Sequence, residues 1–461
     1  MSNEQKIQIL KDKRDLINSV SPCFCTAKWL QTTLYLQNGY NHSCHHPAPH
    51  KIPIEEVLEN PSALHNSKFK KQQRAKMLDG TRPEECKYCW NIEDLGKDYF
   101  SDRHYKTSDY WAWDRFEEVS QSNPDDNIAP SYLEVSFSNV CNFKCSYCSS
   151  EISSQWLSEI KQHGPYPTKH GNHDLTWMKQ VGRYPYKHSD NNPYVDAFWL
   201  WFPTILPTLK VFRITGGEPL LSKDTWRVLD YIIEHKPTPM QIAINSNLCV
   251  EDEFIDKLVA KVNQLIDLGH DVKVFTSAES GAERSEYSRY GMDFALWRKN
   301  LERMLSETKS VVAVMTTINV LSIGDFNPLV DIIMDYRARY NKAFDYNRIP
   351  LSVNYLSWPP YLSVSILPAE YKNKFAEEIL AHCKVWLMQN DESWRPAKIY
   401  LEEWDQIQRL CDYLKTSTHD EQSRTDFVAF IEEYDKRRST SFANTFPEYI
   451  ELLENFKNGR L

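Results

Sequence analysis

Strand-like and helix-like segments alternate regularly between residues 132 and 355. Short segments with the apolar pattern of strands are followed by longer segments with helical periodicity. The expected strands are 132–137, 209–214, 241–245, 272–277, 311–321 and 351–355. The expected helices are 153–162, 226–234, 254–268, 294–305 and 328–340. Alternation at this spacing predicts βα units and a parallel sheet, in which functional loops follow the carboxyl ends of the strands.

The regions on either side of this alternation have different patterns. Before it, cysteines separate short apolar stretches, with a predicted hairpin turn at Asn38-Gly39 and a charged helical segment at 67–78. A turn-rich connector at 123–130 follows. The last hundred residues are helical in pattern. We therefore expect an N-terminal domain at 1–127, an α/β domain at 128–360 and a helical C-terminal region at 361–461.

Charge and hydropathy exclude some classes of protein. The net charge of −9 argues against a nucleic-acid binder that relies on a broad basic surface. No stretch approaches 18 uninterrupted apolar residues, and the first 20 residues lack the features of a cleavable signal, so we expect a cytoplasmic protein with no membrane partner. In a reducing compartment, eleven cysteines are better explained by metal ligation than by disulfides.

Three cysteines lie close together directly after the first expected strand. Cys141, Cys145 and Cys148 form a Cys-x3-Cys-x2-Cys run. Three thiolates on one loop can each bind one iron of a cubane cluster, and without a fourth cysteine nearby one iron stays open to another ligand. The alternative is a zinc site completed by a distant residue, although structural zinc sites usually pair two couplets and close all four positions.

A second motif follows the second expected strand and reads Gly216-Gly217-Glu218-Pro219. Two glycines let the backbone approach a ligand without interference from a Cβ atom. The carboxylate beside them can accept a hydrogen bond from an ammonium group. By itself, this segment is also typical of an ordinary strand-to-helix turn.

Together, the two motifs resemble those of the radical S-adenosylmethionine (SAM) superfamily. The resemblance implies a partial (β/α)6 TIM-like barrel in which Cys141, Cys145 and Cys148 ligate a [4Fe–4S] cluster. In members of the superfamily, the open iron binds the amino and carboxylate groups of SAM. One electron from the cluster cleaves SAM to methionine and a 5′-deoxyadenosyl radical, which abstracts a substrate hydrogen.

The resemblance also implies contacts with SAM. It places the backbone at Tyr147 near the adenine and the SAM amine at the Gly-Gly-Glu-Pro segment. Asn247 lies where relatives often carry Thr-Asn-Gly, with Leu248 in place of the glycine. Ser277 and Glu279 resemble a Ser-x-Asp segment whose serine meets the methionyl carboxylate or ribose. For each of these three, the alternative is a capping or turn role.

The N-terminal cysteines form a second set. They have the pattern Cys-x13-Gly-x4-Cys followed by Cys-x2-Cys, at Cys25, Cys44, Cys86 and Cys89. Taken alone, two couplets equally describe a zinc site. The pattern resembles the twitch domain, a shortened form of the SPASM domain, which implies an auxiliary [4Fe–4S] cluster. In relatives this domain usually follows the barrel, whereas here it precedes it. Cys23 is a spare thiol, and the spacing favours Cys25 as the ligand.

The function implied is that of a radical SAM enzyme with two clusters. By analogy with twitch and SPASM relatives, the substrate is a peptide or protein, and the electron comes from a reductant such as a flavodoxin or ferredoxin. A carbohydrate or nucleotide-sugar substrate is the alternative within the same chemistry. A zinc-stabilised binding protein and a degenerate radical SAM scaffold are alternatives without this catalysis. No catalytic acid or base stands out in the irregular segment 163–195.

One segment of the helical C-terminal region has a recognisable pattern. It contains Asp435-Lys436-x-Arg438, Phe442 and Phe446-Pro447-Glu448. A similar tail occurs in some twitch-containing relatives, but a helix end followed by a docking turn is the better interpretation.

Overall fold

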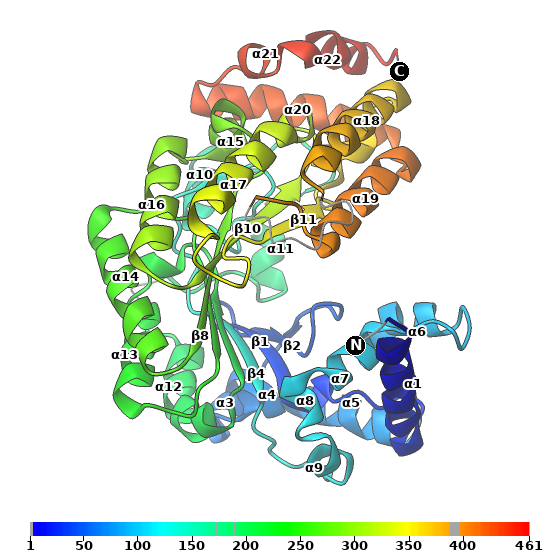
Figure 1. The fold of residues 1–461 in the computed structure, drawn as a ribbon, viewed down its shortest axis with the longest axis vertical. Helices are drawn as coiled ribbons and strands as arrows, with labels where there is room; N and C mark the ends of the chain where they lie inside the picture. Colours follow the sequence, from blue (N-terminus) through cyan, green and yellow to red (C-terminus); the bar gives the residue numbers. More distant parts are fainter. Residues whose placement is uncertain (1–2, 172–173, 188–189, 388–396, 461) are drawn as a thin grey trace. The chain divides into compact units, whose positions relative to one another are not determined.

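The computed structural model describes residues 3–171, 174–187, 190–387 and 397–460, and Figure 1 shows the course of the chain. The chain divides into two compact units. The first comprises residues 1–139, 179–243 and 268–271, and the second comprises residues 140–178, 244–267 and 272–461.

The first unit is built on a sheet with a parallel centre. Its strands are β1 (Gln31–Tyr35), β2 (Tyr40–His42), β3 (His50–Lys51), β4 (Tyr132–Ser136) and β6 (Val211–Thr215). Strand β4 pairs in parallel with β1 on one side, where Gln31 is opposite Tyr132, and with β6 on the other. Strands β2 and β3 extend the sheet from β1 in antiparallel fashion. The N-terminal region therefore continues the sheet that contains β4 (Figure 1).

Helices surround this sheet. They are α1 (Asn3–Val20), α2 (Ala27–Leu30), α3 (Ile54–Glu59), α4 (Ala63–Asn66), α5 (Lys68–Leu78), α6 (Lys87–Glu93), α7 (Asp102–Ser108), α8 (Tyr110–Trp113), α9 (Phe116–Ser120), α12 (Pro193–Ile205) and α13 (Lys223–His235). The start of α5 follows from its sequence, because the Ser67 hydroxyl accepts a hydrogen bond from the Lys70 amide as an N-cap. Phe24, Trp29 and Trp111 form an apolar cluster with Val211 of β6.

The second unit is also α/β. Its main strands are β8 (Asp271–Ser277), β10 (Val311–Ile318) and β11 (Leu351–Tyr355), of which β10 pairs in parallel with both of the others. A short antiparallel ladder joins β5 (Lys144–Cys145) to β9 (Arg289–Tyr290). Strand β7 (Gln241–Asn245) and helix α11 (Leu175–Gln180) are each divided between the two units.

The remaining helices belong to the second unit. They are α10 (Ser154–His163), α14 (Asp252–Asp267), α15 (Ala282–Ser288), α16 (Phe294–Glu307), α17 (Phe326–Tyr340), α18 (Ala369–Trp386), α19 (Leu401–Thr416), α20 (Glu421–Arg438), α21 (Phe442–Thr445) and α22 (Ile450–Lys457). Helix α18 packs against α19, and α20 packs against α22. The C-terminal region is therefore helical, as its sequence pattern predicts.

The α/β class and the mostly parallel strands agree with the sequence prediction, and each expected strand and helix of the alternating region is present. The predicted turn at Asn38-Gly39 joins β1 to β2. The partial (β/α)6 barrel stays a prediction, as do the domain boundaries at 127 and 360. The segment 163–195 contains α11 and the start of α12, while its residues 172–173 and 188–189 lie outside the described part of the chain.

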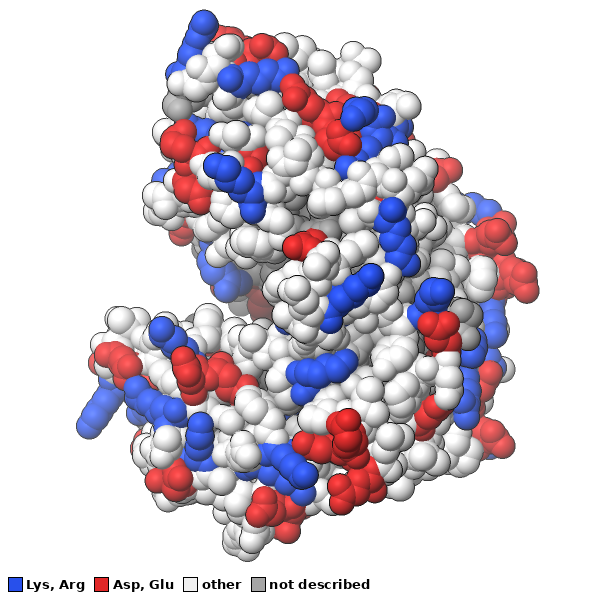
Figure 2. Space-filling view, turned by 180° about the vertical axis from the view of Figure 1, so that it is seen from behind, with Lys and Arg blue, Asp and Glu red and all other residues white. Residues whose placement is uncertain are grey.

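Two surface properties bear on possible partners. Within the described ranges, no helix combines the length and the apolar character that crossing a bilayer requires. On the face shown in Figure 2, Lys and Arg side chains are interspersed with Asp and Glu side chains.

Gly39 is the glycine of the Cys-x13-Gly-x4-Cys pattern, and the fold requires it. Its φ is +70°, and a Cβ atom there would lie 2.1 Å from the ring of the fully buried Tyr194. We expect Gly39→Ala to lower the free energy of unfolding by about 2–4 kcal/mol, which combines backbone strain with overpacking. The midpoint of urea unfolding measures this loss.

Gly80→Ala is the matched control for this substitution. Gly80 has a similar φ of +84°, but a Cβ atom there would meet only Pro22, at 3.9 Å. We expect a loss of about 1 kcal/mol, from backbone strain alone. Equal losses at the two glycines would show that contact with Tyr194 is not the reason why the fold needs glycine at position 39.

Candidate metal centres

The cysteine run after β4 forms a compact loop in the second unit. Cys141, Cys145 and Cys148 are all half-buried. Cys145 lies in β5, and its carbonyl accepts a hydrogen bond from the Cys148 amide at 2.9 Å. The Phe143 amide donates to the Cys141 sulfur at 3.4 Å. The loop therefore carries three thiols on a short piece of backbone that is held by hydrogen bonds.

Helix α10 holds the loop in place. The Ser153 hydroxyl, which caps α10, donates to the Phe143 carbonyl at 2.7 Å. The Trp156 indole donates to the Cys145 carbonyl at 2.8 Å. Phe143 and Trp156 are both buried, so apolar packing supports these hydrogen bonds. The expected strand-loop-helix context of the cysteine run is therefore present.

A buried ion pair lies beside the loop. The Arg289 guanidinium donates to both oxygens of Glu279, at 2.7 and 2.5 Å, and its Nη1 lies 3.7 Å from the Cys145 sulfur. Tyr147 also donates to Glu279, at 3.0 Å, and the Thr317 amide does so at 3.2 Å. Glu279 is fully buried and Arg289 is 7% exposed. Both carboxylate oxygens of Glu279, which the sequence resemblance places near SAM, thus accept hydrogen bonds from protein groups.

Sequence reasoning did not find Arg289. It lies in β9, which pairs with β5, so the ladder brings it to the cysteine loop from 144 residues away. No local spacing marks such a residue. The signal present in the sequence is indirect: Glu279 lies just after an expected strand, and a carboxylate that is buried there needs a cationic partner.

The protonation of this site follows from its burial. Burial raises the pKa of the Cys145 thiol and raises that of the Cys148 thiol to about 12. Burial likewise raises the pKa of Tyr147 well above its ordinary value, so the phenol keeps its proton and donates to Glu279. Without metal the two thiols are protonated at neutral pH, and metal binding releases their protons.

Asn247 connects the end of β7 to the cysteine loop. Its amide nitrogen donates to the side-chain oxygen of Asn142 at 2.8 Å, and Asn142 donates to the Cys249 carbonyl at 2.7 Å. Leu248 has a φ of +56°, a backbone conformation that favours glycine. Ser277 ends β8, where it is half-buried and opposite Met315 of β10.

The first two residues of the Gly-Gly-Glu-Pro segment pack against the chain after β4 in the first unit. Gly216 has a φ of +126°, and a Cβ atom there would lie 2.8 Å from the Ser136 hydroxyl oxygen and 2.9 Å from the Ser138 carbonyl oxygen. The Gly217 amide donates to that carbonyl at 3.4 Å. Close backbone approach therefore explains the first glycine.

The other two residues begin a short 3-10 helix. Glu218 is 1% exposed, and its side chain accepts a hydrogen bond from the Leu220 amide at 3.0 Å. Pro219 is the first residue of the helix, a position that needs no donor. The structure gives Glu218 a local capping role, and a bond from Glu218 to the SAM amine stays a prediction.

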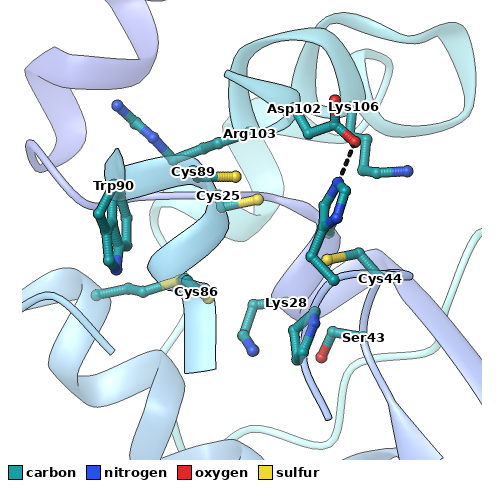
Figure 3. A pocket seen from close by; sticks show the side chains of 14 residues that line it. Cys25, Lys28, Ser43, Cys44, Cys86, Cys89, Trp90, Asp102, Arg103 and Lys106 are labelled. Carbon is teal, nitrogen blue, oxygen red and sulfur yellow. Dashed lines mark hydrogen bonds and ion pairs between the residues drawn. The ribbon is translucent and has the colours of Figure 1, made fainter. Parts of the chain in front are cut away.

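The second set of cysteines lines a pocket in the first unit, shown in Figure 3. The four cysteines are Cys25, Cys44, Cys86 and Cys89, and their sulfur atoms face the same space. They come from four places: the turn before α2, the loop after β2, the turn before α6, and α6 itself. Thiols from such separate parts of the chain meet here because tertiary packing brings them together.

The two neighbouring N-terminal thiols, of Cys23 and Cys25, differ in their position relative to the pocket. Cys25 lines it, whereas Cys23 is not among its lining residues. The Cys23 sulfur instead donates to the Gly80 carbonyl at 3.3 Å. The geometry therefore agrees with the preference for Cys25 that the spacing indicates.

Cations surround the four thiols. Lys28, 3% exposed, pairs with Glu85, and Arg103, 2% exposed, pairs with Glu93 at 2.7 Å. Lys106 also lines the pocket. Burial raises the pKa of Cys86 and of Cys89 to about 12. A full set of four thiols with cations nearby suits a closed metal centre, because the cations offset the charge of the thiolates.

A histidine also lines the N-terminal pocket. His46 lines the pocket, donates a hydrogen bond to the Asp102 carboxylate at 2.6 Å and stacks on Tyr88 with 3.7 Å between ring centroids. Across the described residues, no three or more His, Cys, Asp or Glu side chains are arranged to chelate a single metal ion. The two cysteine sets therefore fit a cluster by the chemistry of their thiol donors and not by an arrangement that already surrounds a metal.

The C-terminal segment packs behind the cysteine loop. Arg438, at the end of α20, pairs with Glu159 of α10 at 3.1 Å, and Glu159 pairs with Lys144 of β5 at 2.7 Å. Asp435 accepts hydrogen bonds from the Tyr287 hydroxyl at 2.8 Å and the Phe442 amide at 2.7 Å. The segment is thus a helix end followed by a turn that docks on the unit.

Comparisons with known proteins give a structural similarity and no match in sequence. Models of protein families gave no match, and curated proteins gave none. Among solved structures, the chain is similar to SuiB of Streptococcus suis, described as bound to S-adenosylmethionine, with a TM-score of 0.37 and 14% identity over 77% of this chain and 69% of that chain. The function proposed below therefore rests on the residues of this chain.

The Glu279–Arg289 pair makes a testable contribution to stability. Glu279→Gln would leave the Arg289 charge buried without its partner, and we expect a loss of about 3–5 kcal/mol in the free energy of unfolding. Glu307→Gln is the control, because Glu307 pairs with Arg303 at the surface and should cost about 1 kcal/mol or less. Urea unfolding of both variants measures the difference, and similar losses would contradict the prediction.

The choice between Cys23 and Cys25 can be tested by metal analysis. In a chain that carries Cys145→Ala, we expect Cys25→Ser to remove the metal of the N-terminal pocket, whether iron or zinc, because one of the four thiols is lost. Cys23→Ser in the same background should retain it. Elemental analysis of the purified variants measures the metal, and the reverse result would assign Cys23 as the ligand.

Proposed function

We propose that this chain is a radical SAM enzyme that holds a SAM-binding [4Fe–4S] cluster on Cys141, Cys145 and Cys148. When bound, the cluster and SAM would supply a 5′-deoxyadenosyl radical able to abstract a hydrogen from a substrate. The observation that carries the proposal is the loop of three half-buried thiols directly after parallel strand β4. Three protein thiols leave a cubane with one iron for SAM.

The surroundings of the loop support this proposal. Arg289 lies 3.7 Å from the Cys145 sulfur and is held by Glu279, so it places positive charge next to a thiolate ligand. Such charge favours the deprotonated thiol that metal binding requires. Trp156 and Phe143 bury the back of the loop, which limits access of water to the site. The chain thereby positions three ligands and protects them.

We also infer that an auxiliary [4Fe–4S] cluster is held by the N-terminal pocket. Support comes from the four thiols that line it and from the buried cations Lys28 and Arg103. Four protein ligands close a cluster, which suits electron transfer or a structural role more than substrate binding. A zinc ion held by the same four thiols is the second candidate, because sites built from four cysteine ligands are typical of structural zinc.

The proposed substrate is a peptide or protein, with a carbohydrate or nucleotide-sugar as the second candidate. This class rests on the resemblance of the N-terminal cysteines to those of twitch domains. A flavodoxin or ferredoxin is the proposed electron donor.

The experiment that tests the proposal is anaerobic reconstitution with iron and sulfide, followed by SAM and dithionite. We expect a brown protein that forms 5′-deoxyadenosine from SAM. Cys145→Ala should abolish this product, because one of the three loop ligands is lost, while iron in the N-terminal pocket is retained. Chromatography of the product and iron analysis give the two measurements.

Two other outcomes would identify the alternatives. A colourless protein with stoichiometric zinc would overturn the proposal in favour of a zinc-stabilised binding protein. A brown protein that forms no 5′-deoxyadenosine under strong reduction would identify a scaffold that keeps its clusters without cleaving SAM.

A further inference from the structure

A separate pocket lies in the first unit, beyond the carboxyl ends of parallel strands β1 and β4. Gln37, two residues after β1, lines it together with Phe137 and Ser138, which follow β4. Trp199 of α12 and Asp224 of α13 also line it. This is the edge of a parallel sheet at which ligands bind in α/β proteins. Neither set of cysteines contributes to it.

Gln37 has an unsatisfied amide group in this pocket. The side chain is 1% exposed, and its Oε1 accepts a hydrogen bond from the Ser136 hydroxyl at 2.9 Å. Its Nε2 has no hydrogen-bond partner in the part of the chain that is described. An unsatisfied buried donor destabilises the fold, because it has lost its hydrogen bonds to water. A ligand that offers an acceptor to Gln37 would recover this cost.

Asp224 supplies an acceptor in the same pocket. The carboxylate is 6% exposed, and its Oδ1 accepts a hydrogen bond from the Trp199 indole at 3.0 Å. Among the described residues, the Trp199 indole is the one hydrogen-bond partner of this carboxylate, so its second oxygen is left for a donor on a ligand. The pocket therefore combines a buried donor, from Gln37, with a buried acceptor, from Asp224.

The charges of the pocket favour a neutral ligand. Among the described residues that line it, three are cationic and three are anionic, namely Lys187, Lys223, Arg227, Asp190, Asp196 and Asp224. A lining whose formal charges cancel gives no net attraction to an ion of either sign. The group that it binds should therefore be uncharged and should carry both an acceptor and a donor.

Phe137, Tyr186 and Trp199 are the aromatic residues of the described lining, and Trp199 offers no open ring face to a sugar. Sugar rings bind by stacking on an open aromatic face, but the Arg227 guanidinium lies 3.8 Å from the centre of the Trp199 ring. Phe137 lies parallel to the same ring, at 6.4 Å between centroids. With its ring engaged by these neighbours, Trp199 contributes its indole donor to Asp224 rather than a platform for a ligand.

We propose that this pocket binds a main-chain amide of the substrate peptide, with Gln37 donating to the carbonyl and Asp224 accepting from the N–H. An amide is the neutral group of peptides that carries both functions. The inference rests on the proposed function, from which it takes the peptide nature of the substrate. Gln37 and Asp224 would be residues that position the substrate and take no part in the chemistry.

The test uses the reconstituted protein and the probe N-acetylglycine N-methylamide, with methyl β-glucopyranoside as a sugar probe. Saturation-transfer NMR titrations measure the binding of each probe. We expect the amide to bind, and Gln37→Met to weaken it about tenfold, because the donor is lost while side-chain volume is kept. Asp224→Asn should weaken it similarly. Gln264→Met, the same change at an exposed position, should bind as the unmodified protein does.

Several results would overturn the proposal. They are binding of the glucoside in preference to the amide, absence of amide binding, and equal amide binding by the Gln37→Met variant. A loss of SAM binding in that variant would instead assign the pocket to SAM. Thermal unfolding midpoints confirm that the variants are folded. Formation of 5′-deoxyadenosine, measured on the same samples, reports separately on the proposed function.

Discussion

The cysteine loop of the second unit depends on the buried ion pair between Glu279 and Arg289. A charge without a partner in this interior would lower the free energy of unfolding by several kcal/mol, so Glu279 and Arg289 each offset the cost of burying the other. The pair has further consequences, because Glu279 orients Tyr147 and Arg289 reaches the Cys145 sulfur. Glu279, which resembles part of a SAM site, thus acts on the cysteine loop through its neighbours.

The N-terminal pocket meets the same physical requirement in another way. Four thiols there would become anionic on binding a metal, and burial alone opposes that change by raising the pKa of Cys86 and Cys89. Buried Lys28 and Arg103 compensate. Both cysteine sets therefore combine thiols from low-polarity surroundings with a cation whose own partner is a carboxylate. This shared arrangement supports assigning both sets to metal binding.

Much of the fold was predictable because it depends on local pattern. The alternation of strands and helices, the hairpin turn at Gly39 and the Ser67 cap of α5 follow from periodicity and turn chemistry within short windows. The thiols of the loop were also predictable, since their spacing is local. Arg289 was not, nor was the extension of the sheet by β1 onto β4, because both depend on pairing between distant segments.

The sequence by itself determined the α/β character, the two sets of cysteines and the chemistry that thiols in such patterns support. Tertiary structure alone decided which residues surround them. It placed four distant cysteines around one pocket, engaged Glu279 with Arg289, and left the Gln37 amide without a partner among the described residues. The reason is that burial and hydrogen-bond partners are set by contacts between segments far apart in the chain, which no local spacing records.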